Sequence, residues 1–103
     1  MCRTDNSGGC VASKNLLNKY GHLKWCFREK PINDIDTGWR FLSNIDTEEY
    51  INDSENLVIC SINSIVQLEP AILSIMHLPV GTDVSLGCKG TQKFFVNSNG
   101  EEV

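Results

Sequence analysis

The sequence predicts one α+β domain, in which a mainly antiparallel sheet of about five to six strands carries two or three packed helices. A chain of 103 residues is too short to divide into two halves that each bury a core. Short apolar or alternating runs of strand length are interrupted by segments with helical spacing, a mixture typical of this class. We expect the domain to span residues 9–97, with flexible ends at residues 1–8 and 98–103.

The first strand and the first helix are expected at the start of this domain. Residues 9–13 alternate loosely between apolar and polar side chains, which predicts a short strand. Residues 14–20 follow with apolar side chains at helical spacing. Ser13 is a suitable N-cap for this helix, and Gly21 a suitable C-terminal stop.

The next two strands are expected to form an antiparallel hairpin. Residues 23–29 alternate and place Leu23, Trp25 and Phe27 on one predicted face. A polar loop follows, and residues 39–43 then resume extended structure with aromatic side chains at alternate positions.

The middle of the chain predicts a helical turn and then a buried strand. Residues 47–51 favour one helical turn, with Asp46 as its cap and acidic residues in its first turn. Residues 57–62 form a continuous apolar run of strand length. This run predicts a central strand that is buried on both faces and is the most buried segment of the protein.

The last third predicts two helices and a hairpin. Residues 63–68 form a short helix, and residues 70–77 form a second, strongly apolar helix that begins with proline. Residues 83–88 and 93–96 are predicted to pair as a hairpin around Gly90.

Charge is distributed unevenly along the chain, although the net charge is only −4. Residues 33–55 contain seven acidic residues, with Arg40 as the sole positive charge. Such a segment repels nucleic acid and attracts a basic protein surface, although a merely solvated loop would have the same composition. No apolar run approaches the roughly 18 residues of a membrane span, and the start of the chain lacks the apolar stretch of a signal peptide. We therefore expect a cytoplasmic protein that binds neither nucleic acid nor a membrane.

The cysteines and histidines do not predict a chemical site. The five cysteines are odd in number and lack an export signal, so reduced thiols are expected, with Cys10, Cys26 and Cys60 packed as small apolar residues. His22 and His77 stand in no catalytic motif, and the cysteine spacing does not suit zinc. The sequence therefore predicts a binding protein, not an enzyme, with no cofactor and no metal.

Several short motifs occur together in a specific order. They are Arg28-Glu29-Lys30-Pro31, Asn33, Asp36-Thr37-Gly38-Trp39-Arg40-Phe41, Asp46 and Glu49-Tyr50-Ile51-Asn52-Asp53, with weaker matches at Cys10-Val11-Ala12-Ser13, Asn63-Ser64-Ile65, Pro70-Ala71-Ile72-Leu73 and Leu78-Pro79-Val80-Gly81. Over residues 9–97 this pattern resembles a small bacterial domain of unknown function. By genome context, that domain is grouped with the immunity proteins of polymorphic toxin systems as immunity-protein family thirty-three.

The resemblance implies an antitoxin that binds a cognate toxin, such as a basic nuclease or another effector, and it leaves the oligomeric state open. The expected partner-binding residues are Asp34, Asp36, Trp39, Arg40, Asp46, Glu48, Glu49, Tyr50 and Asp53. The expected structural residues of the motif are Arg28, Glu29, Pro31, Gly38 and Phe41.

Alternatives remain open at this point. In a small-molecule or peptide binding module, Arg28, Trp39, Arg40 and Tyr50 would line a pocket around an anionic group. In a purely structural reading, Trp39 and Phe41 belong to the core, Gly38 allows a tight turn, and Arg28 and Arg40 pair with Glu29 or Asp36 to order the loop.

Overall fold

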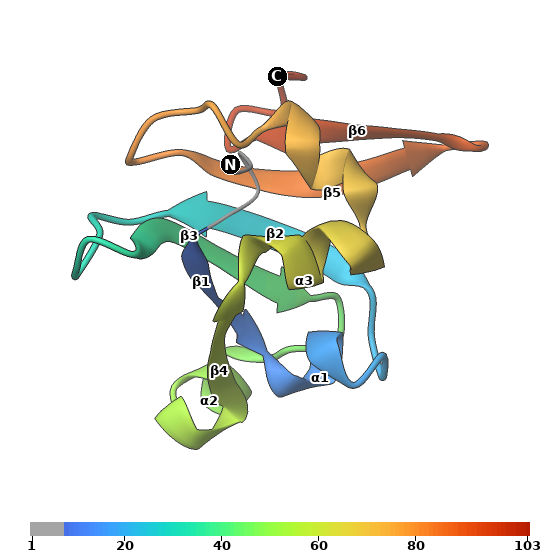
Figure 1. Cartoon of the computed structure of the whole chain (residues 1–103). Helices are drawn as coiled ribbons and strands as arrows, with labels where there is room; N and C mark the ends of the chain where they lie inside the picture. Colours follow the sequence, from blue (N-terminus) through green and yellow to red (C-terminus); the bar gives the residue numbers. More distant parts are fainter. Residues whose placement is uncertain (1–7) are drawn as a thin grey trace.

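A six-stranded sheet runs through residues 8–103, the part of the chain that the computed structural model describes (Figure 1). Its strands are β1 (Gly9–Ser13), β2 (Leu23–Arg28), β3 (Asp36–Ser43), β4 (Leu57–Ser61), β5 (Asp83–Lys89) and β6 (Gln92–Asn97). They lie in the order β4-β1-β3-β2-β5-β6, and every neighbouring pair is antiparallel except β1 and β3. The predicted α+β class, with a mainly antiparallel sheet and a single domain, is confirmed.

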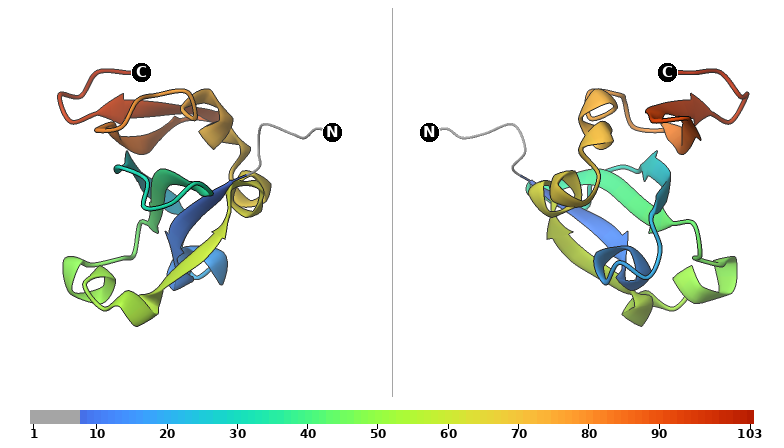
Figure 2. Two further views of the ribbon diagram at one scale, coloured as in Figure 1. Left: turned by 60° about the vertical axis from the view of Figure 1, so that its left-hand side comes forward. Right: turned by 90° about the vertical axis from the view of Figure 1, so that its right-hand side faces the viewer.

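Most of the helices pack on one face of the sheet. The helices α1 (Lys14–Leu17) and α3 (Ile62–Leu68) and the 3-10 helix η2 (Pro70–Ser74) pack on the same face (Figure 1). Figure 2 shows α2 (Glu48–Ile51) on the other side of the sheet from α3. A second 3-10 helix, η1 (Ser54–Asn56), leads into β4. The core between sheet and helices consists of Cys10, Ala12, Leu16, Leu23, Cys26, Trp39, Phe41, Ile62, Ile65, Ile72, Ile75, Val84 and Phe95. None of the helices in residues 8–103 is long and apolar enough to cross a membrane.

Several local predictions are confirmed. The Oγ of Ser13 accepts a hydrogen bond from the N–H of Leu16 at 3.2 Å and caps α1 as expected. This helix is shorter than predicted and ends at Leu17, since Lys19 adopts a positive φ of 64°. The hairpins β2–β3 and β5–β6 form as predicted.

The predicted face pattern of β2 is wrong. A bulge between Leu23 and Trp25 inserts one extra residue, and the side chains beyond it change face. Leu23 and Cys26 therefore point into the core, whereas Trp25 is 43% exposed. Alternation in the sequence carries no record of a bulge, because the bulge depends on pairing with β3.

The prediction that residues 57–62 form a central, most buried strand is also wrong. β4 is an edge strand that pairs only with β1, and its middle residue, Ile59, is 78% exposed. The most buried strand is β3, which is buried from Gly38 to Ser43. An apolar run indicates that a segment can be buried on both faces, but it does not specify how many strands will flank it.

Two helix predictions need correction. The apolar segment that was predicted as a helix over residues 70–77 forms only the 3-10 helix η2, Pro70–Ser74. Thr47, not Asp46, caps α2, since its side chain accepts the N–H of Tyr50 at 3.1 Å. Asp46 instead accepts hydrogen bonds from the N–H of Ser43 at 2.6 Å and from Asn15 Nδ2 at 2.8 Å.

The two chain ends differ in how much of them is described. Of the predicted flexible segment 1–8, only Gly8 lies within the described residues, and its carbonyl accepts a hydrogen bond from Ile62 N–H at 3.0 Å. Residues 98–103, also expected to be flexible, turn back along β6. Val103 N–H donates to Phe95 O at 2.9 Å, and Glu102 forms a bridge with Val96.

Candidate docking surface

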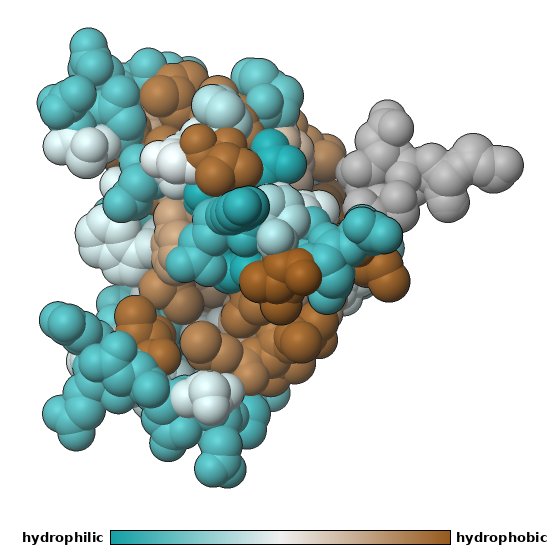
Figure 3. Space-filling model, turned by 90° about the vertical axis from the view of Figure 1, so that its left-hand side faces the viewer, coloured by the Kyte–Doolittle hydropathy of each residue, from teal (hydrophilic) through white to brown (hydrophobic). Residues whose placement is uncertain are grey.

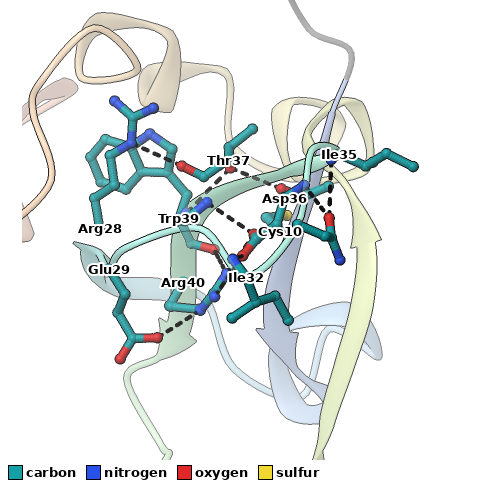
Figure 4. Close-up of polar contacts among 12 residues, drawn as sticks. Cys10, Arg28, Glu29, Ile32, Ile35, Asp36, Thr37, Trp39 and Arg40 are labelled. Atoms are coloured by element: carbon teal, nitrogen blue, oxygen red, sulfur yellow. Dashed lines mark hydrogen bonds and ion pairs between the residues drawn. The ribbon is translucent and has the colours of Figure 1, made fainter.

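Arg40 holds both ends of the loop that joins β2 to β3, residues 29–35. Its Nη1 and Nη2 donate to the two carboxylate oxygens of Asp36 at 2.9 and 3.0 Å, and its Nε donates to Glu29 Oε2 at 2.9 Å (Figure 4). Glu29 begins the loop and Asp36 follows its end, so one guanidinium group closes it. The two parallel hydrogen bonds between the Arg40 guanidinium and the Asp36 carboxylate make this ion pair strong and directional.

Asp36 in turn orders the loop backbone. Its Oδ2 accepts the N–H of Ile32 at 3.0 Å, and its Oδ1 accepts the N–H of Gly38 at 2.9 Å. Hydrogen bonding to Arg40 is the largest effect on this carboxyl and holds its pKa well below the usual value, although burial opposes the shift. Asp36, predicted to contact a partner, is thus part of the frame that supports the loop.

This pKa shift predicts acid-sensitive stability. A carboxyl whose pKa is lowered on folding contributes stability above its unfolded pKa of about 3.9, and that contribution is lost as the pH falls. We therefore expect Asp36→Asn to lower the free energy of unfolding by about 2 kcal/mol at neutral pH, with the difference shrinking as the pH drops below about 4. Urea unfolding across a pH series measures this. Asp34→Asn, at an exposed loop position, is the control. A pH-independent difference for Asp36→Asn would contradict the prediction.

Arg28 and the aromatic residues of the motif make contacts within the fold. Arg28 donates from Nε to Thr37 O at 2.9 Å and from Nη1 to Leu78 O at 2.7 Å. Its guanidinium carbon lies 5.8 Å from the ring centroid of Trp39 (Figure 4), and that ring stacks on Phe41 at 6.0 Å. Trp39 is 1% exposed and Arg40 is 8% exposed. Neither of these two predicted partner-binding residues lies on the outer surface.

Three exposed isoleucines surround a cleft beside the loop. Ile32 and Ile35 on the loop are 75% and 73% exposed, and Ile59 on β4 is 78% exposed. The cleft between the loop, β1 and β4, called here the β4 cleft, has a volume of about 190 Å³. Figure 3 faces this side and shows apolar side chains gathered between hydrophilic ones. The cleft is lined by Gly9, Cys10, Val11, Ile32, Asn33, Ile35, Asp36 and Ile59.

The predicted acidic residues fall into two groups. Asp34 is exposed on the loop between Asn33 and Ile35, which both line the β4 cleft. The other group belongs to the segment of α2 and η1: Glu48, Glu49 and Asp53 are exposed, whereas Asp46 and Tyr50 are half-buried. Pro31 is exposed in the loop. Asp36 is thus the only predicted acidic contact that lines the cleft within residues 8–103, and the exposed Asp34 is its neighbour in the loop.

The sequence analysis did not identify the three isoleucines as binding residues. Ile32 and Ile35 carry a detectable signal, since they are the apolar residues of an otherwise polar loop. Ile59 carries no such signal, because its apolar run is equally typical of a core strand.

Two cysteine thiols lie together between β1 and β4, and one of them, Cys10, belongs to a residue that lines the cleft. Cys10 and Cys60 face each other across β1 and β4, with their sulfur atoms 3.7 Å apart. The hydrogen bond between the two thiols lowers the pKa of Cys60 and raises that of Cys10. Burial raises the pKa of the Cys26 thiol. All three thiols are free, and Cys10 and Cys26 are fully packed as predicted, whereas Cys60 is only partly buried.

Comparison with known proteins gives one match. No curated protein matches this chain, and no solved structure matches it. The model of the family described as the Immunity protein Imm33 domain matches residues 10–95, which include the whole β2–β3 loop and all six strands in whole or in part. The chain therefore belongs to the Immunity protein Imm33 domain family.

Proposed function

We propose that this protein neutralises a cognate toxin by direct contact, and that the toxin docks on the β4 cleft and the adjoining β2–β3 loop. The family is one of immunity proteins, which implies a toxin partner in general and a generally non-enzymatic role. The observation that carries the proposal is the group of three isoleucines, each more than 70% exposed, around one cleft.

An exposed apolar group of this kind favours a protein partner. Fully burying one such side chain stabilises a complex by roughly 1.5–3 kcal/mol, so three neighbouring isoleucines supply a substantial driving force. Exposed apolar patches rimmed by polar residues are typical of protein interaction sites. The polar residues that line the cleft are Asn33 and Asp36, and Asp34, the exposed neighbour of Asn33, follows in the loop.

The charge on this side favours a basic partner. Arg40, the sole cation of residues 33–55, is neutralised by Asp36 and Glu29. Asp34 and the acids of α2 and η1 are exposed and outnumber the one exposed cation of the loop, Lys30. Exposed charge of one sign accelerates association with a partner of the opposite sign, and salt screens this effect.

The alternative of an anion-binding module has less support. It requires arginines that point into a pocket with unpaired guanidinium groups. Arg40 is instead bonded to two carboxylates, and Arg28 is bonded to two backbone carbonyls and lies against Trp39. Both groups therefore already serve the fold.

Replacing Ile59 with lysine is expected to weaken toxin binding at least about tenfold, because a charge would replace an apolar side chain at the cleft. To find the cognate toxin, each toxin domain encoded in the same genome is co-expressed in bacteria with this protein, one domain at a time. The cognate domain is the one whose growth inhibition this protein relieves. Calorimetry on the purified pair then measures the dissociation constant.

Leu73→Lys is the matched control for this experiment, since Leu73 is 49% exposed on η2, on the helix-covered side of the sheet. Asp34→Lys tests the charge and is expected to slow association, whereas Glu102→Lys near the C-terminus is not. Equal effects of Ile59→Lys and Leu73→Lys would rule out the cleft. A failure of every toxin domain to be neutralised would rule out the function.

A further inference from the structure

We infer that the outer edge of β4 pairs with an extended segment of the partner, which adds a seventh strand to the sheet beside the β4 cleft. The inference rests on the proposed function and specifies how the toxin is held. It is carried by the hydrogen-bonding register of β4, the lack of edge protection on this strand, and the cleft beside it.

The register shows which backbone groups of β4 face outward. Ile62 N–H donates to Gly8 O, and Gly9 directs its own N–H to Ile35 O on the β3 side. In an antiparallel ladder the bonded pairs alternate, so Cys60 and Val58 bond to β1. The residues between them, Leu57, Ile59 and Ser61, therefore turn their backbone groups toward the outer edge.

Some of these outward backbone groups already form hydrogen bonds to nearby residues of this chain. The others form a continuous row along the edge. Leu57 N–H donates to Ser54 O, and Ser61 caps α3, so its carbonyl belongs to the helix. The carbonyl of Leu57, both backbone groups of Ile59 and the N–H of Ser61 then remain along the edge. No strand of residues 8–103 lies beyond β4 in the sheet.

In the part of the chain that the structure describes, β4 lacks the features that usually protect an edge strand. Natural edges are blunted by charged residues, by proline, by bulges or by a covering segment. β4 reads Leu-Val-Ile-Cys-Ser, pairs with β1 without a bulge and presents Ile59 at 78% exposure. Strand addition to such an edge is a common mode of peptide recognition, in which backbone bonds give affinity and side-chain pockets give specificity.

The cleft and the nearby charges indicate which residue types the partner segment would have. A residue opposite Ile59 would place its side chain on the same face as Ile59, beside the cleft, which favours an apolar side chain there. Asp34 lies by the cleft, and Asp53 and Glu55 precede the first residue of β4. Basic residues on either side of the apolar one would complement these acids.

The same charges disfavour a second copy of this chain as the occupant. Two antiparallel β4 strands would bring together two chains that each carry a net charge of −4 and the same exposed acids. Like charges in an interface oppose association. A basic toxin segment has the opposite sign, and the proposal therefore commits to it.

Amide hydrogen exchange tests the pairing directly. The probe is the toxin domain that this protein neutralises in the growth assay, and exchange is compared between the free protein and the complex. We expect the amides of Ile59 and Ser61 to slow at least about tenfold in the complex, while those of Val58 and Cys60 are protected in both states. A complex that leaves Ile59 and Ser61 unchanged would overturn strand addition while the immunity function stands.

If no toxin domain is neutralised in the growth assay, a peptide titration tests strand addition to β4 instead. An end-blocked hexapeptide of alternating lysine and valine is titrated against the isotopically labelled protein, with glutamate in place of lysine as the control. Shifts centred on the Ile59 and Ser61 amides for the lysine peptide alone would support the edge site. Absence of shifts at β4, or equal shifts with the glutamate peptide, would overturn it. Protection of the same amides in the free protein at rising concentration would indicate self-pairing and also overturn it.

Discussion

Replacing Arg40 with methionine is expected to lower the free energy of unfolding by about 3–5 kcal/mol, because the change leaves a buried carboxylate without its cation. The side chains of Arg40 and Asp36 are 10% and 9% exposed, so water replaces little of the lost interaction. Glu29 is 57% exposed and contributes less. The same substitution would remove the link between Glu29 and Asp36 at the two ends of the loop that carries Ile32 and Ile35.

Urea unfolding followed by circular dichroism measures this loss. Lys24→Met is the matched control, since Lys24 is a half-buried cation on neighbouring β2. Among residues 8–103 it donates only to Leu86 O and pairs with no carboxylate. We expect that control to cost less than about 1.5 kcal/mol. The double variant Arg40→Met with Asp36→Asn should recover part of the loss, because it removes the unpaired charge. Equal losses for Arg40→Met and Lys24→Met would show that the ion pair does not stabilise the fold.

Replacing Gly38 with alanine is expected to lower the free energy of unfolding by more than about 3 kcal/mol. Gly38 has a φ of 89°, which side-chain-bearing residues rarely adopt. An added Cβ would also collide with the backbone carbonyl oxygen of Glu29, the residue that follows β2. That backbone cannot move aside easily, because Glu29 N–H donates to Gly38 O at 2.8 Å.

Gly81→Ala separates the two causes. Gly81 has a φ of 99°, but no atom of residues 8–103 lies within 4 Å of an added Cβ at that position. The control therefore retains the unfavourable backbone conformation without the collision and should cost about 1–2 kcal/mol. Thermal unfolding of both variants measures the difference, and loss of cooperative unfolding in Gly38→Ala alone would agree with it. Similar losses in the two variants would show that the collision is relieved by a small shift of the backbone.

Much of the fold could be predicted from the sequence because the signals are local. Ser13 was identified as a cap from its side chain and position, and the β2–β3 and β5–β6 hairpins from turn residues between strand-like runs. The same holds for the motif around Gly38, where a structural pairing of Arg40 with Asp36 and Glu29 was one of the alternatives left open. Positive φ, cap geometry and opposite charges at short separation all follow from neighbouring residues.

The sequence by itself thus determined the α+β class, the hairpins and the acidic character of residues 33–55. Only the tertiary structure decided that β4 lies at an edge, that β2 has a bulge, and that Ile59 meets Ile32 and Ile35 at one cleft. These features depend on contacts between segments far apart in the chain. An apolar run has the same composition whether one strand or two flank it, so the number of its neighbours is fixed only when the sheet assembles.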